Sequence, residues 1–318
     1  MPKDNHPEDN TFTVTVFDDV DKPASGTVRT MAWSAFVQHF NHKKSDTREG
    51  RCISPVTYRD NYRNQANALT RHGLAGDFEQ ALREDKQTGE LTTVGPPPVP
   101  PAVAAERLAE HGYAAVVITT FKHTPEKPRF RVIPLCKGPI DYPDDPEERA
   151  ITFEAEAEGQ KLFYASIGLA DGLDTSKLKA DATYYTPRCP DLSVAERYVV
   201  QGMPLDFEPW LEKGRAVVQR RLAEQAEAAQ LAAEAAEERR QSNRADGHDT
   251  SLLEDVRNAL PTFEQALADS GYTYFPRLGR WLYPHSTSGM PGVLILTGRD
   301  GFERYVSHHA SDPLGMHT

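Results

Sequence analysis

Short segments of alternating or continuous apolar residues dominate the first part of the chain. Residues 11–17 (Thr-Phe-Thr-Val-Thr-Val-Phe) alternate as far as Val16, which predicts a strand. Residues 114–120 and 129–135 are rich in Val and Ile and flank a loop with Pro125 and Pro128, so they predict two strands joined by a turn. Other segments predict helices at 31–40, 102–110 and 143–166, strands at 183–185 and 198–200, a strand end at 74–79, and a polar loop at 42–60.

The order of these elements indicates the fold class and the domains. Strands and helices are intermixed, which favours an α+β domain with a central, mostly antiparallel sheet over residues 1–205. A segment rich in Ala, Glu, Arg and Gln follows and predicts an exposed linker helix within 206–249. The remainder, 250–318, predicts a small α/β unit with a helix at 252–268 and strands at 272–275, 280–283, 293–296 and 304–306.

Composition and charge argue against several function classes. The chain of 318 residues has a net charge of -11. Such acidity argues against a protein that coats DNA with a broad basic surface, but a local basic groove remains compatible with it. The three cysteines are widely spaced and predict neither a disulfide framework nor a cysteine-rich zinc site. No apolar leader and no membrane-spanning run is present, so we expect a cytoplasmic protein without a membrane partner.

The predicted turn at 121–128 and the strand after it carry a compact cluster of cations. The side-chain period of two places Arg129 and Arg131 on one face of the strand. His123 and Lys127 lie in the turn. Because guanidinium groups match phosphate oxygens in a bidentate manner and lysine adds a point charge, the cluster predicts a polyphosphate site. A basic, solvated hairpin is the alternative.

Acidic residues at the end of the 74–79 segment suit a metal site. Carboxylates hold divalent cations, which stabilise the charge on reacting phosphate groups. Asp77 and Glu79 lie two positions apart, so their side chains project from the same face of a strand. They are candidate ligands for Mg²⁺ or Mn²⁺, and two surface acids at a strand end are the alternative. Asp19 and Asp21 form a competing pair after the first predicted strand.

Residues 114–135 also resemble a known family. The strand, His-Thr-Pro-Glu-Lys-Pro-Arg and Arg-Val-Ile-Pro-Leu closely resemble the second motif of the archaeo-eukaryotic primase superfamily, in the primase-polymerase proteins of plasmids, prophages and integrated elements. The resemblance covers residues 11–205 and implies the fold predicted above. It also implies that the basic residues of the motif hold the triphosphate of the incoming nucleotide, with Arg131 facing the reacting phosphates. These residues are His123, Lys127, Arg129 and Arg131.

Residues 74–79 resemble the first motif of that family, an apolar run followed by acid, apolar residue and acid. The motif implies that Asp77 and Glu79 are metal ligands at the protein surface, whose removal leaves the fold intact. In the family the metal-binding acids come later than the first strand, so the order of motifs makes Asp19 and Asp21 a solvated turn.

A third segment, Gly172-Leu173-Asp174 followed by Tyr184-Tyr185-Thr186-Pro187, resembles the family's apolar-Asp motif and its downstream aromatic-x-Pro. The resemblance implies that Asp174 is the third metal ligand. Asp171 and Asp181 are neighbouring alternatives. Arg63, before the first motif, is expected either to reach a template or nucleotide phosphate or to lie on a helix surface.

The last part of the chain resembles a small module of mobile-element replication proteins that often lies between a primase domain and a hexameric helicase. No Gly-x-x-x-x-Gly-Lys-Ser/Thr motif is present, so we expect any helicase to be a separate chain. His285, His308 and His309 lack a regular metal-ligand spacing. Core packing is the default expectation for the aromatic residues, and stacking on single-stranded bases is the alternative. The residues concerned are Tyr272, Tyr274, Trp281 and Tyr283, with Arg277 and Arg280.

The resemblance, together with the acidic and basic clusters, implies a template-directed nucleotidyltransferase, a DNA primase/polymerase of a mobile-element replication system. Its partners would be single-stranded DNA, NTP or dNTP, and a helicase from another chain. Phe121, where relatives have a small hydroxyl residue, and Glu79, where Asp is common, depart from the family pattern. These departures favour a second hypothesis, a non-catalytic initiation or helicase-recruitment protein that binds DNA. A nuclease that uses His123 and a metal is the third hypothesis.

Overall fold

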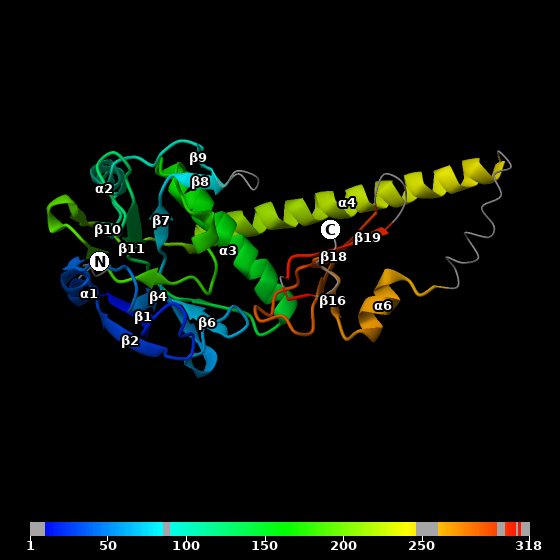
Figure 1. Ribbon diagram of the computed structural model, residues 1–318, viewed down its shortest axis with the longest axis horizontal. Helices are drawn as coiled ribbons and strands as arrows, with labels where there is room; N and C mark the ends of the chain where they lie inside the picture. The colour runs from blue at the N-terminus through cyan, green and yellow to red at the C-terminus, as the bar shows by residue number, and fades with distance from the viewer. Residues whose placement is uncertain (1–9, 85–89, 246–259, 298–302, 310, 313–318) are drawn as a thin grey trace, which may run out of the picture. The chain divides into compact units, whose positions relative to one another are not determined.

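The computed structural model describes residues 10–84, 90–245, 260–297, 303–309 and 311–312 (Figure 1). The chain divides into two compact units, which we call the first unit (1–144 with 152–216) and the second unit (145–151 with 217–318). Helices and mostly antiparallel sheets are mixed, as the sequence predicts.

The first sheet of the first unit contains the strand predicted from alternation. β1 (Thr11–Phe17) pairs antiparallel with β2 (Thr27–Ala32) and β4 (Cys52–Ser54), and β13 (Tyr184–Tyr185) pairs with β4. The strand order is β13-β4-β1-β2. Phe12 and Val14 are buried as the alternation predicts, but Thr15 and Phe17 are buried as well, so the second half of β1 is covered on both faces.

The prediction of a loop at 42–60 was wrong. This segment contains β3 (Lys43–Lys44), β4 and β5 (Val56–Tyr58). Each of these strands has two or three residues, and all residues of β4 are buried. A strand that is short and buried on both faces has no polar-apolar alternation, so the pattern did not reveal it.

The second sheet contains both strands of the predicted hairpin and the first acidic segment. Its order is β15 (Arg197–Val200), β10 (Ala115–Thr119), β11 (Phe130–Pro134), β7 (Gly76–Phe78), and all neighbouring strands are antiparallel. The register places Asp77 opposite Arg131 and Phe78 opposite Phe130. Sequence segments that lie far apart therefore meet on one strand pair.

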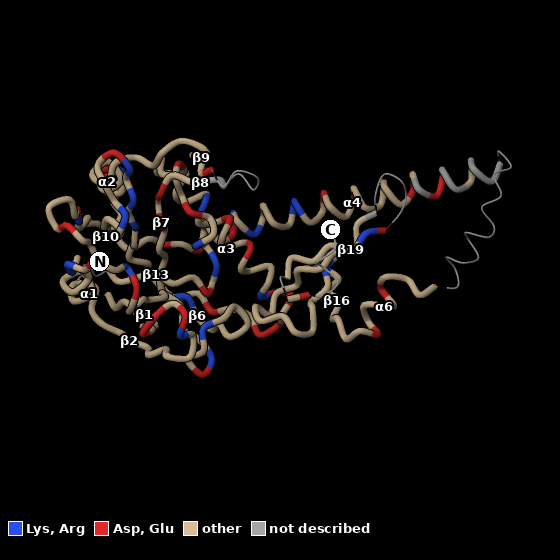
Figure 2. Tube along the Cα trace, viewed as in Figure 1, with Lys and Arg blue, Asp and Glu red and all other residues tan. Residues whose placement is uncertain are grey.

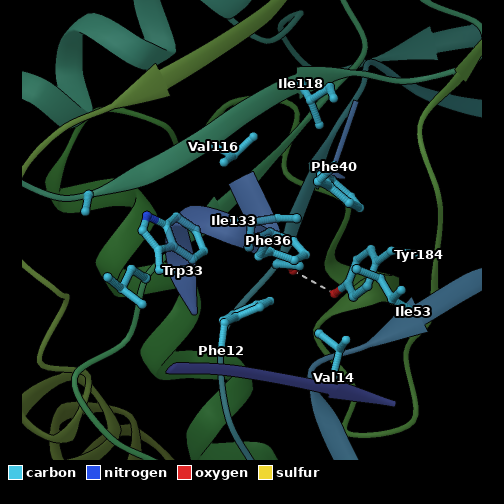
Figure 3. Close-up of a cluster of buried hydrophobic side chains, with 13 residues drawn as sticks. Phe12, Val14, Trp33, Phe36, Phe40, Ile53, Val116, Ile118, Ile133 and Tyr184 are labelled. Atoms are coloured by element: carbon cyan, nitrogen blue, oxygen red, sulfur yellow. Dashed lines mark hydrogen bonds between the residues drawn. The ribbon is translucent and has the colours of Figure 1, made fainter. Parts of the chain in front are cut away.

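A core of apolar side chains joins the two sheets and helix α1 (Trp33–His39) (Figure 3). Phe36 lies against Phe12 with ring centroids 4.4 Å apart. The hydroxyl of Tyr184 donates to the carbonyl of Ala75 at 2.6 Å, which satisfies the one polar atom that this tyrosine buries. The labelled core residues are Phe12, Val14, Trp33, Phe36, Phe40, Ile53, Val116, Ile118, Ile133 and Tyr184.

The opposite face of the second sheet packs against helix α3 (Pro146–Ser166). Phe78 and Phe130 stack with centroids 5.0 Å apart, and Tyr164 of α3 meets Phe78 edge-on at 5.2 Å. A Cβ atom at Gly76 would lie 2.8 Å from the Tyr164 ring. Gly76, directly before the first acid of the motif, thus has a physical reason, since a side chain there would collide with this ring.

The remaining elements of the first unit form smaller pairs around these two sheets. Helix α2 (Pro101–Glu110) contacts β10 and β15, and it begins with a proline at its first position, as is common in helices. A three-stranded sheet has the order β12-β6-β5, and two-stranded sheets pair β14 with β3 and β8 with β9. The new strands are β6 (Ala68–Arg71), β8 (Ala81–Glu84), β9 (Leu91–Val94), β12 (Ile140–Asp141) and β14 (Arg188–Cys189).

Helix α4 (Glu208–Ala245) confirms the predicted long polar helix. Acidic and basic residues both recur along it (Figure 2). Within the first unit, α3 and the start of α4 approach so closely that a Cβ at Gly214 would lie 1.9 Å from the carbonyl oxygen of Ala155. A Cβ at Gly159 would lie 2.6 Å from the carbonyl oxygen of Trp210. Backbone meets backbone at both glycines.

The second unit contains helix α6 (Phe263–Asp269) and a four-stranded antiparallel sheet. Thr262 and Gln265 form a reciprocal capping box at the start of α6. The first part of the helix predicted at 252–268 lies outside the described residues. Tyr272, Trp281 and Tyr283 are buried, so they belong to the core of this unit, whereas Tyr274 is exposed. The strands are β16 (Thr273–Phe275), β17 (Arg280–Leu282), β18 (Val293–Thr297) and β19 (Glu303–Ser307).

The contact of α3 with α4 provides a test of the fold. We expect Gly214→Ala to lower the free energy of unfolding by about 1–3 kcal/mol, because the added methyl overlaps backbone atoms that cannot rotate away. Gly138→Ala is the matched control, since a Cβ there meets nothing within 4 Å. Urea unfolding followed by circular dichroism measures both variants. Equal stability of the two variants would contradict the close approach of the helices.

Candidate functional site

The predicted acidic and basic segments of the first unit meet at one cavity of about 280 Å³. The end of β7 and the β10–β11 turn line part of it, and the segments 174–177 and 183–188 line the rest. Val20 and Arg48 also contribute. Asp77, Glu79, Asp174, Arg129 and Arg131 all line this cavity, whereas His123 and Lys127 do not.

Asp77 and Arg131 form a bidentate ion pair across β7 and β11. Nε of Arg131 donates to Oδ1 of Asp77 at 2.6 Å, and Nη2 donates to Oδ2 at 3.1 Å. The Asp77 side chain is 17% exposed and that of Arg131 is 6% exposed. The carboxylate is therefore not an isolated surface group, and the expectation that its removal leaves the fold intact does not agree with this geometry.

Arg131 also holds the segment that follows the third acidic motif. Its Nη1 donates to the carbonyl of Tyr185 at 2.7 Å, and its guanidinium lies over the Tyr184 ring, 4.7 Å from the centroid. Each guanidinium nitrogen thus donates to a protein oxygen. Arg131 is more deeply buried than Arg129, and in this arrangement its hydrogen bonds go to protein groups.

Glu79 and Arg129 form a second, more exposed ion pair on the same face. Nη1 of Arg129 lies 2.6 Å from Oε2 of Glu79, and the two side chains are 23% and 40% exposed. The common face of Arg129 and Arg131 is confirmed, since both pair with acids of one strand end while Phe130 faces α3. The two arginines of the hairpin are therefore neutralised by the acids predicted to bind metal.

Asp174 lies beside Asp77 in the backbone. Its N–H donates to the carbonyl of Asp77 at 2.8 Å, while its carboxylate accepts from the backbone N–H of Ser176 at 3.0 Å. Gly172 fixes this approach, because its φ is +73° and a Cβ there would lie 2.7 Å from Pro98. Asp171 and Asp181, the alternatives to Asp174, do not line the cavity.

Asp77, Glu79 and Asp174 have the ligand chemistry that a divalent cation requires. Oxygen ligands are those that Mg²⁺ takes in proteins, and three acids line one cavity. Among the described residues, however, no three side chains of His, Cys, Asp or Glu group closely enough to hold a metal ion. Asp77 and Glu79 face arginines instead. Metal binding at Asp77, Glu79 and Asp174 stays a prediction.

His123 supports the turn from within the protein. Its side chain is 2% exposed, and Nδ1 accepts from the backbone N–H of Arg129 at 3.1 Å. Nε2 then carries the proton and lies 3.3 Å from Oε1 of Glu196, a contact without hydrogen-bond geometry. Lys127 is exposed in the turn, and Phe121 and Lys122 line the cavity in place of His123.

The competing residues near the N-terminus have structural contacts. Arg63 donates to the carbonyls of Asp181 and Val20, so both of its Nη atoms bond the backbone. It does not line the cavity. Asp19 accepts from the backbone N–H of Val20 and lies 3.5 Å from the Tyr185 hydroxyl. Val20 of this turn lines the cavity, whereas Asp19 and Asp21 do not.

Sequence reasoning assigned no role to Arg48, Lys122, Lys177, Tyr185 or Arg188, and all five line the cavity. Tyr185 and Arg188 lie in or next to the predicted aromatic-x-Pro segment, so the sequence could have indicated that they lie near the site. Arg48 lies in the segment predicted as a polar loop, where no pattern distinguishes it from other surface arginines.

Comparison of the chain with protein-family models, with curated proteins and with solved structures found no match. Within the described part of the chain, no helix combines the length and the apolar character needed to cross a membrane.

The two ion pairs differ in burial, which gives a prediction. We expect Asp77→Ala to lower the free energy of unfolding by about 3 kcal/mol, because it leaves the buried Arg131 charge without its partner. Glu79→Ala should cost less than about 1 kcal/mol, because its pair is more exposed. Urea denaturation of the full chain measures both.

A double substitution separates the cost of leaving a buried charge unpaired from other effects of the substitution on stability. Asp77→Leu combined with Arg131→Met removes both charges and should recover much of the stability that Asp77→Leu alone loses. A small, equal loss for Asp77→Ala and Glu79→Ala would show that the deeper pair does not stabilise the fold.

Proposed function

We propose that the chain is a template-directed nucleotidyltransferase, a DNA primase/polymerase of a mobile-element replication system. The observation that supports this most is the meeting of Asp77, Glu79 and Asp174 with the basic hairpin at one cavity. Its substrates are NTP or dNTP on a single-stranded DNA template, and it acts in the cytoplasm with Mg²⁺ or Mn²⁺. A helicase from another chain is its proposed partner at the fork.

The residues have separate tasks in this proposal. Asp77, Glu79 and Asp174 would hold Mg²⁺ or Mn²⁺, which would supply charge stabilisation for the phosphate oxygens. Arg131 orients the Asp77 carboxylate through two hydrogen bonds. Arg129 reaches the cavity and contributes positive charge near Glu79.

His123 and Lys127, assigned to the nucleotide by the resemblance, act differently in their present positions. His123 holds the backbone of Arg129 and thereby the start of β11. Lys127 adds long-range positive charge from the turn.

A second candidate function is a non-catalytic initiation or helicase-recruitment protein that binds DNA on the same scaffold. The two ion pairs favour it, because the acids that would bind metal are paired with arginines. This candidate needs no divalent cation for its activity.

The deciding experiment measures incorporation of labelled dNTP and NTP on single-stranded DNA with Mg²⁺ or Mn²⁺. We expect the wild-type chain to incorporate nucleotide and Asp174→Ala to lose at least about 100-fold in rate, because several kcal/mol of charge stabilisation disappear. Asp171→Ala is the matched control, since that acid is exposed and lies outside the cavity lining.

Two outcomes would count against the polymerase proposal. Incorporation by Asp174→Ala at the wild-type rate would remove that residue from the metal site. DNA binding without incorporation under any metal and template tried would favour the recruitment protein.

A further inference from the structure

The cavity contains cations that the acids do not neutralise. Arg129 and Arg131 each pair with a carboxylate, as described above. Arg48, Lys177 and Arg188 line the same cavity, and in the described part of the chain no carboxylate lies within ion-pair distance of any of the three. Lys122 of the β10–β11 turn also lines the cavity, and these three residues add positive charge to it from segments outside the hairpin.

A glycine makes room for the side chain of Arg188. Its guanidinium donates to the carbonyl of Glu49, and its Nη2 lies 2.6 Å from where a Cβ of Gly50 would be. Gly50 has a φ of +114°, a conformation that favours glycine. The absence of a side chain at Gly50 thus allows the Arg188 guanidinium to lie against the backbone.

The two segments that carry Arg48 and Arg188 are bonded to each other. β14 pairs in parallel with β3, and the backbone N–H of Thr186 donates to the carbonyl of Arg51 at 3.0 Å. Arg48 lies over the Tyr185 ring, 5.9 Å from its centroid. The positions of both arginines are therefore set by a shared backbone framework.

Lys177 joins this group from the third acidic segment. It lies in the 3₁₀ turn Thr175–Lys177, whose N-cap is Asp174. Its Nζ is 3.4 Å from the carbonyl of Thr183, so it has a neutral partner and keeps its charge available. The same turn thus presents Asp174 and Lys177 to the cavity.

We propose that Arg48, Lys177 and Arg188 form the site that holds the phosphates of a nucleoside triphosphate, while Arg131 orients Asp77. Guanidinium groups bind phosphate oxygens in a bidentate manner, and a lysine adds a point charge. A cavity of about 280 Å³ is near the size of small-ligand sites, which favours a nucleotide over a strand. The nucleoside part of this assignment rests on the proposed function, whereas the phosphate part rests on charge and geometry.

The test measures binding of inorganic tripolyphosphate, dATP and ATP to the full chain by titration calorimetry. We expect Arg48→Ala and Lys177→Ala each to weaken binding of all three ligands about tenfold or more. Arg29→Ala is the control of equal charge change, since Arg29 is exposed on β2 and lies outside the cavity lining. Arg188→Ala is tested in the same way, and Arg188→Lys is used instead if Arg188→Ala does not fold. Circular dichroism shows whether each variant folds.

The outcomes distinguish this inference from the proposed function. Unchanged affinity for tripolyphosphate in Arg48→Ala and Lys177→Ala would overturn it. Unchanged nucleotide affinity with weakened binding of single-stranded oligo(dT) would also overturn it and assign these cations to a template. The wild-type chain could also fail to incorporate nucleotide while Arg48→Ala and Lys177→Ala weaken nucleotide binding. That result would support the inference and contradict the polymerase proposal.

Discussion

The ion pair of Asp77 and Arg131 holds the candidate site together. Arg131 reaches from β11 to Asp77 on β7 and to the carbonyl of Tyr185 beyond it, and the carbonyl of Asp77 in turn accepts from the N–H of Asp174. Three segments that are distant in sequence are thereby fixed around one guanidinium. Because the pair is largely buried, loss of either partner leaves a charge that the protein interior solvates poorly.

The opposite side of the same strands explains why this pair can be maintained. Phe78 and Phe130 alternate with the charged residues and stack beneath Tyr164 of α3. A register shift of one residue would exchange charges and rings between the faces, which would bury the charges against α3. Apolar packing on one face thus specifies the charge pairing on the other.

Sequence patterns predicted the parts of the site that follow from local periodicity. Alternation gave the common face of Arg129 and Arg131, and spacing gave the common face of Asp77 and Glu79. The pairing of these acids with these arginines depends on strand order and register, which no local pattern encodes. Arg48 escaped prediction for a related reason, since its position near Tyr185 depends on very short strands that carry no periodic signal.

The charge distribution bears on both candidate functions. Mutual neutralisation of two acids and two arginines leaves Asp174 at the same cavity as four further cations, Arg48, Lys122, Lys177 and Arg188. Such a division suits a ligand that is itself anionic, and a protein with a net charge of -11 needs a local concentration of positive charge to attract one. A metal ion delivered with a nucleotide would have to compete with Arg131 for Asp77, whereas Glu79 and Asp174 are less tightly held. The depth of the Asp77–Arg131 pair therefore bears directly on whether the cavity binds a metal-nucleotide complex or only an anion.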